Sequence, residues 1–268
     1  ASGDYVSGPS PAIAASIASG ASFTFTWVYT ATSAGNMWFS VSASGFDPSR
    51  GIPINAPVNG SGEVVVQAPA SLMSSLSLVP QQASVGQAIT VIMSVTNNGG
   101  AAAVSAHGVT TVVTGAGSAA WDGSSWPSVT NLASGESAHF IWVFDAATAG
   151  AINFTSQVRA YDQNTGVTKS AVSAASGTIQ TVPALEAAIS AQPAVIGTGS
   201  TITVRMTVTN NGQAAAVMTM PAGFEAYGTA PVTEITTAYP FGVTINGGAS
   251  ASFTWTYVPT GTGSVSFS

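Results

Sequence analysis

Histidines and carboxylates are the residues of this chain best suited to catalysis or metal binding, and both are sparse. The chain has two histidines, ten acidic residues and no cysteine. A serine triad needs a histidine that is oriented by a carboxylate beside an exposed serine. His107 has no acidic neighbour in the sequence, and His139 is expected to face solvent on the strand face opposite Phe140. The sequence therefore predicts no catalytic residue and no enzyme.

Two aspartates open matching turns and are the strongest candidates for a metal site. Asp162-Gln-Asn164-Thr-Gly166 has the same spacing as Asp47-Pro-Ser-Arg-Gly51. Calcium takes six to eight oxygen ligands, usually including several carboxylates, whereas each turn offers one aspartate and at most one asparagine. Hydrogen bonding of the aspartate to its own turn explains both positions without an ion. We therefore predict no metal and no cofactor.

Charge is almost absent and excludes several kinds of partner. Charged residues make up 5% of the 268 residues, against about 25% in ordinary domains. The net charge is −6, and the four basic residues are scattered, so no nucleic-acid partner is expected. No apolar run is long enough to cross a bilayer, so no membrane insertion is expected. The start of the chain lacks a leader pattern, which indicates a removed leader or a start inside a longer protein.

Two sequence signatures recur with nearly the same period. A strand pattern that opens with Gly-x-Ser and ends on Trp-x-aromatic places tryptophan at Trp27, Trp142 and Trp255, which are 115 and 113 residues apart. A second pattern of alternating apolar residues ends in Asn-Asn-Gly at Asn97 and again at Asn210, 113 residues later. Two independent signatures with one period indicate tandem copies of one structural unit.

The length and composition of the unit predict its fold. About 113 residues of strand and turn match an all-β immunoglobulin-like β-sandwich of about seven strands. Gly and Asn clusters separate the strands, as turns require. The expected domains are 1–70, the C-terminal part of a repeat; 71–184, a complete repeat; and 185–268, the N-terminal part of a repeat. In the complete repeat, strands are predicted near 75–80, 88–97, 102–107, 109–114, 137–145, 150–161 and 167–182.

The tryptophans fall into two groups with different predicted roles. Trp27, Trp142 and Trp255 lie in strands whose alternate residues are expected to face inward, and they are predicted to anchor the core of each repeat. Trp121 and Trp126 lie in a Gly- and Ser-rich segment that is predicted to be a loop. These two either cap an open end of the sandwich or contact a glycan or a second protein. The motifs that begin at Asn59 and Asn153 fit the pattern for N-glycosylation.

Several of these motifs together resemble a known family. The segment Val-Gly-Gln-Ala-Ile-Thr-Val (85–91), the Val-Thr-Asn-Asn-Gly turn (95–99), the tryptophan strand and Ala-Tyr-Asp (160–162) are similar to CARDB-like immunoglobulin-fold repeats of prokaryotic secreted and cell-surface proteins. The resemblance covers essentially the whole chain. It implies an extracellular or cell-surface protein that serves as a stalk, adhesin, sheath or filament, and it carries over no catalytic residues.

The leading functional hypothesis is a structural component of an extracellular fibre, sheath or stalk that self-associates through strand edges and apolar surface. Short linkers near 69–74 and 182–186 would limit bending between repeats. The partial repeats at the two ends would be either a window on a longer array or units completed by a neighbouring subunit. The alternatives are an adhesin or carbohydrate-binding module, and an accessory region of a larger secreted enzyme.

Overall fold

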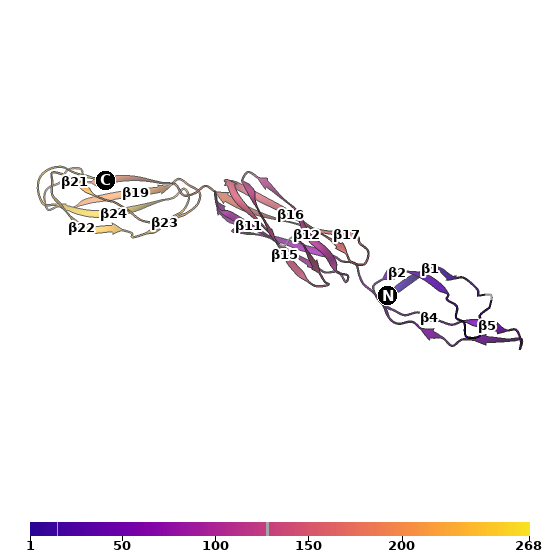
Figure 1. Ribbon diagram of the computed structural model, residues 1–268. Coiled ribbons are helices and arrows are strands. Elements are labelled where there is room, and N and C mark those ends of the chain that lie inside the picture. The colour runs from indigo at the N-terminus through magenta and orange to yellow at the C-terminus, as the bar shows by residue number, and fades with distance from the viewer. Residues whose placement is uncertain (15, 127–128) are drawn as a thin grey trace.

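Strands and connecting segments make up the whole part of the chain that the structure describes. The computed structural model describes residues 1–14, 16–126 and 129–268, and of residues 125 and 126 only the backbone. Within these residues no helix could span a bilayer. The strands gather into three bodies that follow one another along the chain, which we call the first (1–66), middle (72–180) and third (185–267) modules (Figure 1). The all-β class is therefore confirmed.

The middle module is made of two sheets. One sheet has four strands in the order β13-β15-β11-β9, and the other has five in the order β10-β17-β16-β12-β14. All neighbours are antiparallel except β10 and β17, which are parallel. The strands are β9 (Leu72–Val79), β10 (Gln82–Ser84), β11 (Ala88–Asn97), β12 (Ala103–Gly115), β13 (Ser118–Trp126), β14 (Thr130–Leu132), β15 (Ser137–Thr148), β16 (Gly150–Asp162) and β17 (Thr168–Gln180).

Strict alternation of apolar residues builds the core between these sheets. Every second residue of β11 is buried, and Val91 lies opposite Trp142 of β15. Phe144 of β15 meets Phe154 of β16 edge-on, with ring centroids 5.1 Å apart, and so joins one sheet to the other. Such a two-sheet body with one shared apolar core is a β-sandwich. Its largest buried side chains include Val91, Met93, Val95, Leu132, Phe140, Phe154, Val158 and Ile179.

Two expectations for the middle module are wrong in detail. The segment around Trp121 is not a loop, because residues 118–126 form the edge strand β13 against β15. The two strands expected at 102–107 and 109–114 are one strand, β12. Register shifts between Val104 and His107 and between Gly108 and Thr110 absorb extra residues as bulges, so the strand bends without ending.

The third module repeats much of this arrangement. Its four-stranded sheet has the order β18-β19-β24-β22, which corresponds to β9-β11-β15-β13. Phe224 stacks on Trp255 with centroids 4.2 Å apart and helps to close the core. The strands are β18 (Leu185–Gln192), β19 (Ile202–Asn210), β20 (Ala216–Thr219), β21 (Ala226–Gly228), β22 (Val232–Tyr239), β23 (Val243–Ile245), β24 (Ser250–Pro259) and β25 (Val265–Phe267).

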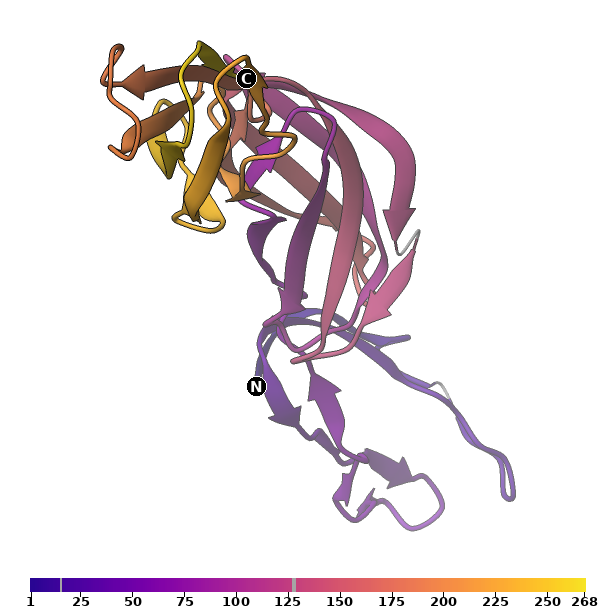
Figure 2. The ribbon, with the colours of Figure 1, turned by 90° about the vertical axis from the view of Figure 1, so that its left-hand side faces the viewer.

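The first module contains counterparts of only some of these strands. β1 pairs with β2 as β13 pairs with β15, and the pairs β3-β8, β4-β7 and β5-β6 together form a hairpin like β16-β17 (Figure 2). Within 1–14 and 16–66, no strand corresponds to β9 or β11. The strands are β1 (Ser2–Ser10), β2 (Thr26–Ser33), β3 (Gly35–Met37), β4 (Ser40–Val41), β5 (Ser44–Asp47), β6 (Ile52–Asn55), β7 (Asn59–Gly60) and β8 (Val64–Val66).

Candidate functional site: intermodule junctions and an apolar groove

The side chain of Asn97 ties the first linker to the end of β11. Asn97 is fully buried, and its Oδ1 accepts hydrogen bonds from the backbone N–H of Ser71 (3.1 Å) and of Gly99 (3.0 Å). Its Nδ2 donates to the carbonyl oxygens of Ala101 (2.8 Å) and Leu132 (3.0 Å). One amide therefore joins the linker, the Asn-Asn-Gly turn and β14 inside the protein.

Asn210 repeats this arrangement at the second junction. Its Oδ1 accepts from the N–H of Ala184 (3.1 Å) and of Gly212 (3.0 Å). Its Nδ2 donates to the carbonyl oxygens of Ala214 (2.8 Å) and Ile245 (3.0 Å). Each of these four distances equals its counterpart at Asn97, and Asn210 is also fully buried. The two junctions thus share one hydrogen-bond design.

The backbone of each linker pairs with the same turn. Ala68 and Ser71 accept hydrogen bonds from the N–H groups of Ala101 (2.8 Å) and Asn98 (2.7 Å). At the second junction, Thr181 and Ala184 accept from Ala214 (3.0 Å) and Asn211 (2.7 Å). A linker whose backbone is paired in this way loses most of its freedom to bend, because bending breaks hydrogen bonds that are partly shielded from water.

The glycine of each turn makes this close approach possible. A Cβ built on Gly99 would lie 2.2 Å from the carbonyl oxygen of Pro69, and one built on Gly212 would lie 2.1 Å from that of Val182. Both contacts are with linker backbone, which has no flexible end to move aside. The glycine of Asn-Asn-Gly is therefore required by the linker that packs on it.

Asp162 adds a charged contact to the first junction. It is 1% exposed at the end of β16, and its Oδ2 accepts from the N–H of Ala70 at 2.6 Å. Its Oδ1 accepts from the N–H groups of Asn164 (3.0 Å) and Thr165 (2.8 Å). The hydrogen bond from Ala70, followed by those from Thr165 and Asn164, lowers the pKa of Asp162, although burial opposes the shift.

Asp47 occupies the matching turn of the first module but makes only local contacts. Its Oδ1 accepts from the hydroxyl (2.6 Å) and the N–H (2.9 Å) of Ser49, and these bonds lower the pKa of Asp47. Both aspartates thus bond to their own turns as the sequence predicts. Within the described residues, no three histidine, aspartate or glutamate side chains lie close enough together to hold a metal ion.

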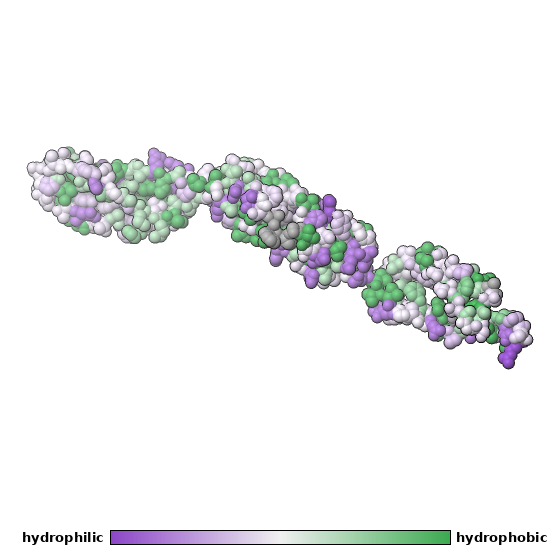
Figure 3. All heavy atoms as spheres, viewed as in Figure 1, coloured by the Kyte–Doolittle hydropathy of each residue, from purple (hydrophilic) through white to green (hydrophobic). Residues whose placement is uncertain are grey.

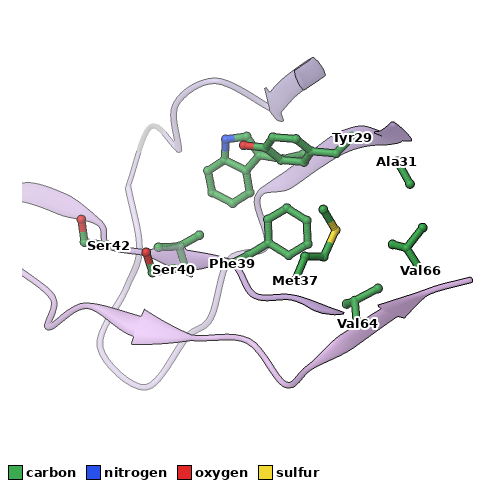
Figure 4. Close-up of a pocket in the computed structure, with 10 residues that line it drawn as sticks. Tyr29, Ala31, Met37, Phe39, Ser40, Ser42, Val64 and Val66 are labelled. Atoms are coloured by element: carbon green, nitrogen blue, oxygen red, sulfur yellow. The ribbon is translucent and has the colours of Figure 1, made fainter. Parts of the chain in front are cut away.

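An apolar groove lies on the first module beside β2. Its volume is about 600 Å³, and it opens between the strand that carries Tyr29 and the hairpin that carries Phe39 and Val64 (Figure 4). Tyr29 and Phe39 meet with ring centroids 4.9 Å apart, much as Phe144 and Phe154 do in the middle module. The groove is lined by Trp27, Tyr29, Ala31, Met37, Phe39, Ser40, Val41, Ser42, Val64 and Val66.

The groove explains why the three strand tryptophans differ in burial. Trp142 and Trp255 are 8% and 4% exposed in closed cores, whereas Trp27 is 37% exposed. In the middle module β11 and β9 continue the sheet beside β15, and β12 of the other sheet approaches Trp142, because a Cβ built on Gly108 would lie 2.5 Å from the indole ring. In the described residues of the first module no strand corresponds to β12, and Trp27 borders the groove; its role as a core anchor stays a prediction.

The other residues singled out by the sequence occupy separate places. Trp121 is 56% exposed on β13, and its indole N–H donates to the carbonyl of Ser124 at 3.0 Å. The side chain of Trp126 lies outside the described residues, so a contact of these two with a glycan or protein stays a prediction. His139 is exposed and bonds to Ser94 (2.9 Å), and His107 bonds to the carbonyl of Ser105 (2.8 Å).

The two asparagines of the glycosylation motifs also differ. Asn59 is exposed in β7. Asn153 lies within β16 and accepts a hydrogen bond from the hydroxyl of Ser176 at 3.1 Å, so its side chain is already engaged. Glycosylation at either position stays a prediction.

Sequence reasoning missed the role of Asn97 and Asn210 as linker clamps, since an Asn-Asn-Gly sequence is sufficiently explained by a turn. The signal was present in the recurrence of the whole tripeptide, which a simple turn does not require. No protein-family model matches the chain, and no curated protein matches it either. The resemblance to CARDB-like repeats therefore stays a prediction.

Proposed function

We propose that this chain is a structural segment of an extracellular fibre, sheath or stalk built from immunoglobulin-like, CARDB-like repeats, and that its role is mechanical and not catalytic. The observation that carries the proposal is the recurrence of one junction. Asn97 and Asn210 make the same four hydrogen bonds with the same lengths. A flexible tether between independent binding modules has no need of such a repeated clamp.

The linkers support a load-bearing role because they are short and are hydrogen-bonded to the module that follows. Only residues 67–71 separate β8 from β9, and only 181–184 separate β17 from β18. Gln67 adds side-chain bonds to Asn164 (2.9 Å) and to the carbonyl of Gly100 (3.2 Å). Force along the chain would pass through these bonds into both sheets of the next module.

The surface supports association with other copies. Basic and acidic residues number only fourteen in 268, so charge repulsion between copies is weak. Apolar side chains are scattered over the visible face of all three modules (Figure 3). Exposed strand edges are further sites of association, because another chain can add a strand to them. Self-association through edges and apolar surface is therefore part of the proposal.

Two measurements on the purified chain test the proposal. Negative-stain electron microscopy at rising concentration should show ordered filaments or straight rods of three modules. Small-angle scattering should give a narrow distribution of lengths for the wild type and a broader one for the Asn97→Ala and Asn210→Ala double variant. Freely bending beads for the wild type at all concentrations would contradict the structural role.

A further inference from the structure

We propose that the outer face of the five-stranded sheet in the middle module binds a carboxylate-bearing sugar, such as a uronic acid of an acidic polysaccharide, through Arg159, His107 and Tyr161. This site goes beyond the mechanical role, because it would attach the segment to a glycan. It lies on β12 and β16, which are interior strands of that sheet and are each paired on both sides.

Strand register places the three side chains next to one another. His107 of β12 lies directly opposite Arg159 of β16, and Tyr161 follows Arg159 by two residues. Val158 and Ala160 on either side of Arg159 are fully buried, whereas Arg159 and Tyr161 are exposed and so face away from the core. Opposed residues have Cβ atoms about 4.5–5.5 Å apart, and residues two apart on a strand are about 7 Å apart. One sugar ring can therefore contact all three side chains.

A bulge in β12 turns His107 toward this outer face. The register shifts between Val104 and His107, and Ser105 within the bulge has a φ of 54°. The imidazole Nδ1 of His107 lies 2.8 Å from the carbonyl oxygen of Ser105, and because a carbonyl only accepts, Nδ1 is the donor. In the neutral imidazole Nε2 is then the acceptor, and a sugar hydroxyl is a suitable donor for it.

The guanidinium of Arg159 has donors available for a ligand. Arg205, an exposed arginine of the third module, donates from Nε (3.0 Å) and Nη2 (2.9 Å) to the hydroxyl of Ser252 on the adjacent strand. The guanidinium of Arg159 makes no such bond and no ion pair with any residue that the structure describes, although His107 and Ser170 lie opposite it. A planar guanidinium with free donors fits a carboxylate through two parallel hydrogen bonds.

The charges around Arg159 favour a local anionic ligand. The only acidic residue of β16, Asp162, is 1% exposed and accepts a hydrogen bond from the N–H of Ala70. The neighbours of Arg159 on the outer face, Gln157 and Ser170, are neutral. The chain as a whole carries a charge of −6, so an acidic polysaccharide is not attracted to it in general. Binding must therefore come from the contacts of this patch.

The neighbours of Arg159 favour a sugar over an acidic peptide. Tyr161 is 39% exposed and offers a ring on which the apolar face of a sugar can pack. An acidic side chain of a peptide would satisfy Arg159 but brings no hydroxyl for Nε2 of His107. A uronic acid carries both a carboxylate and neighbouring hydroxyls on one ring, so it matches all three side chains.

Binding is tested with the full chain and trigalacturonic acid as the probe. Calorimetry should show saturable binding, and the methyl-esterified trisaccharide, which keeps its hydroxyls but has no carboxylate, should bind about tenfold more weakly or worse. Arg159→Gln should weaken binding of the acid by a similar factor, since charged hydrogen bonds are lost. Arg205→Gln is the matched control, because it removes the same charge outside the patch, and it should leave the affinity unchanged.

A second readout locates the site without any variant. Amide resonances that shift on addition of trigalacturonic acid should lie in residues 104–110 and 157–161. Shifts confined to other segments would overturn the proposal. The urea midpoint of each variant should equal that of the wild type, which would show that a loss of binding is not a loss of folding.

Other outcomes overturn the proposal without touching the structural role. No saturable binding, or equal weakening by Arg159→Gln and Arg205→Gln, would mean that the patch is not a site. Binding of polyglutamate as strong as that of the sugar acid, and unchanged in His107→Leu, would assign the patch to an acidic peptide. None of these results alters the rod length or the junction stiffness, which test the proposed function separately.

Discussion

The backbone N–H of Ala70 donates a hydrogen bond to Oδ2 of Asp162, and the two atoms lie 2.6 Å apart. Ala70 belongs to the linker and Asp162 to the end of β16, 92 residues later. This bond attaches the linker to the five-stranded sheet, and Asn97 attaches the linker to the four-stranded sheet.

This bond predicts a dependence of stability on pH. The pKa of Asp162 is lowered in the folded protein, first by the bond from Ala70. The resulting stabilisation is present above the unfolded pKa of about 3.9 and is lost as the pH falls toward the folded pKa. In urea titrations, Asp162→Asn should lower the unfolding midpoint of the middle module at pH 7, and the difference should shrink as the pH falls below about 4. A difference that grows in acid would contradict this assignment.

Removal of the Asn97 side chain should weaken the middle module strongly. Asn97→Ala leaves the buried N–H of Gly99 and the carbonyl of Ala101 without that partner, which costs about 1–3 kcal/mol for each such group. We expect a loss of about 3 kcal/mol in the unfolding free energy measured by amide exchange. Asn98→Ala is the control, since that side chain is exposed and donates a long hydrogen bond to the sulfur of Met73, and it should change stability by less than about 0.5 kcal/mol.

A methyl group on the turn glycine should loosen the junction. Gly99→Ala puts a Cβ 2.2 Å from the carbonyl oxygen of Pro69, so the linker must move. Spin labels on the first and middle modules should then report a wider distribution of distances. Gly197→Ala serves as the control, because a Cβ there meets nothing within 4 Å. An unchanged distribution for Gly99→Ala would show that the linker packing does not set the orientation.

Equivalent aromatic residues should contribute different amounts to the unfolding free energy of their modules. Phe154 is fully buried, so Phe154→Ala should cost about 3–5 kcal/mol in the middle module. Phe39 has the same place in the repeat but lines the open groove, and Phe39→Ala should cost clearly less. Exchange protection of β16 and of β3 measures the two effects. Equal losses would mean that the groove is closed in solution.

The strongly alternating strands were predictable from sequence, and the irregular ones were not. β11 and β15 have unbroken apolar alternation, and the structure places both close to their expected bounds. β13 was missed because its Gly and Ser residues have low β-propensity and its pairing with β15 decides its conformation. The bulges of β12 likewise depend on its neighbours β14 and β16, which no local pattern encodes.

The junction was only partly predictable for a related reason. The linkers were expected to be short. Asp47 and Asp162 were expected to accept hydrogen bonds within their own turns. The partner of Asp162 in the linker and the four bonds of Asn97 join residues distant in sequence, and spacing alone does not reveal such contacts. The exposure of Trp27 depends on which strands pack around it, and its own strand pattern cannot indicate that.

The repeated amide clamp has a geometric consequence for an assembly. The same amide clamp holds each linker against the module that follows it, so we expect a similar rotation and translation from one module to the next. A step of this kind, applied repeatedly, traces a screw with a definite pitch and handedness. The twist of a long array would then be encoded in one asparagine per module, and an altered bond angle at that residue would appear, multiplied by the number of modules, as a change of pitch.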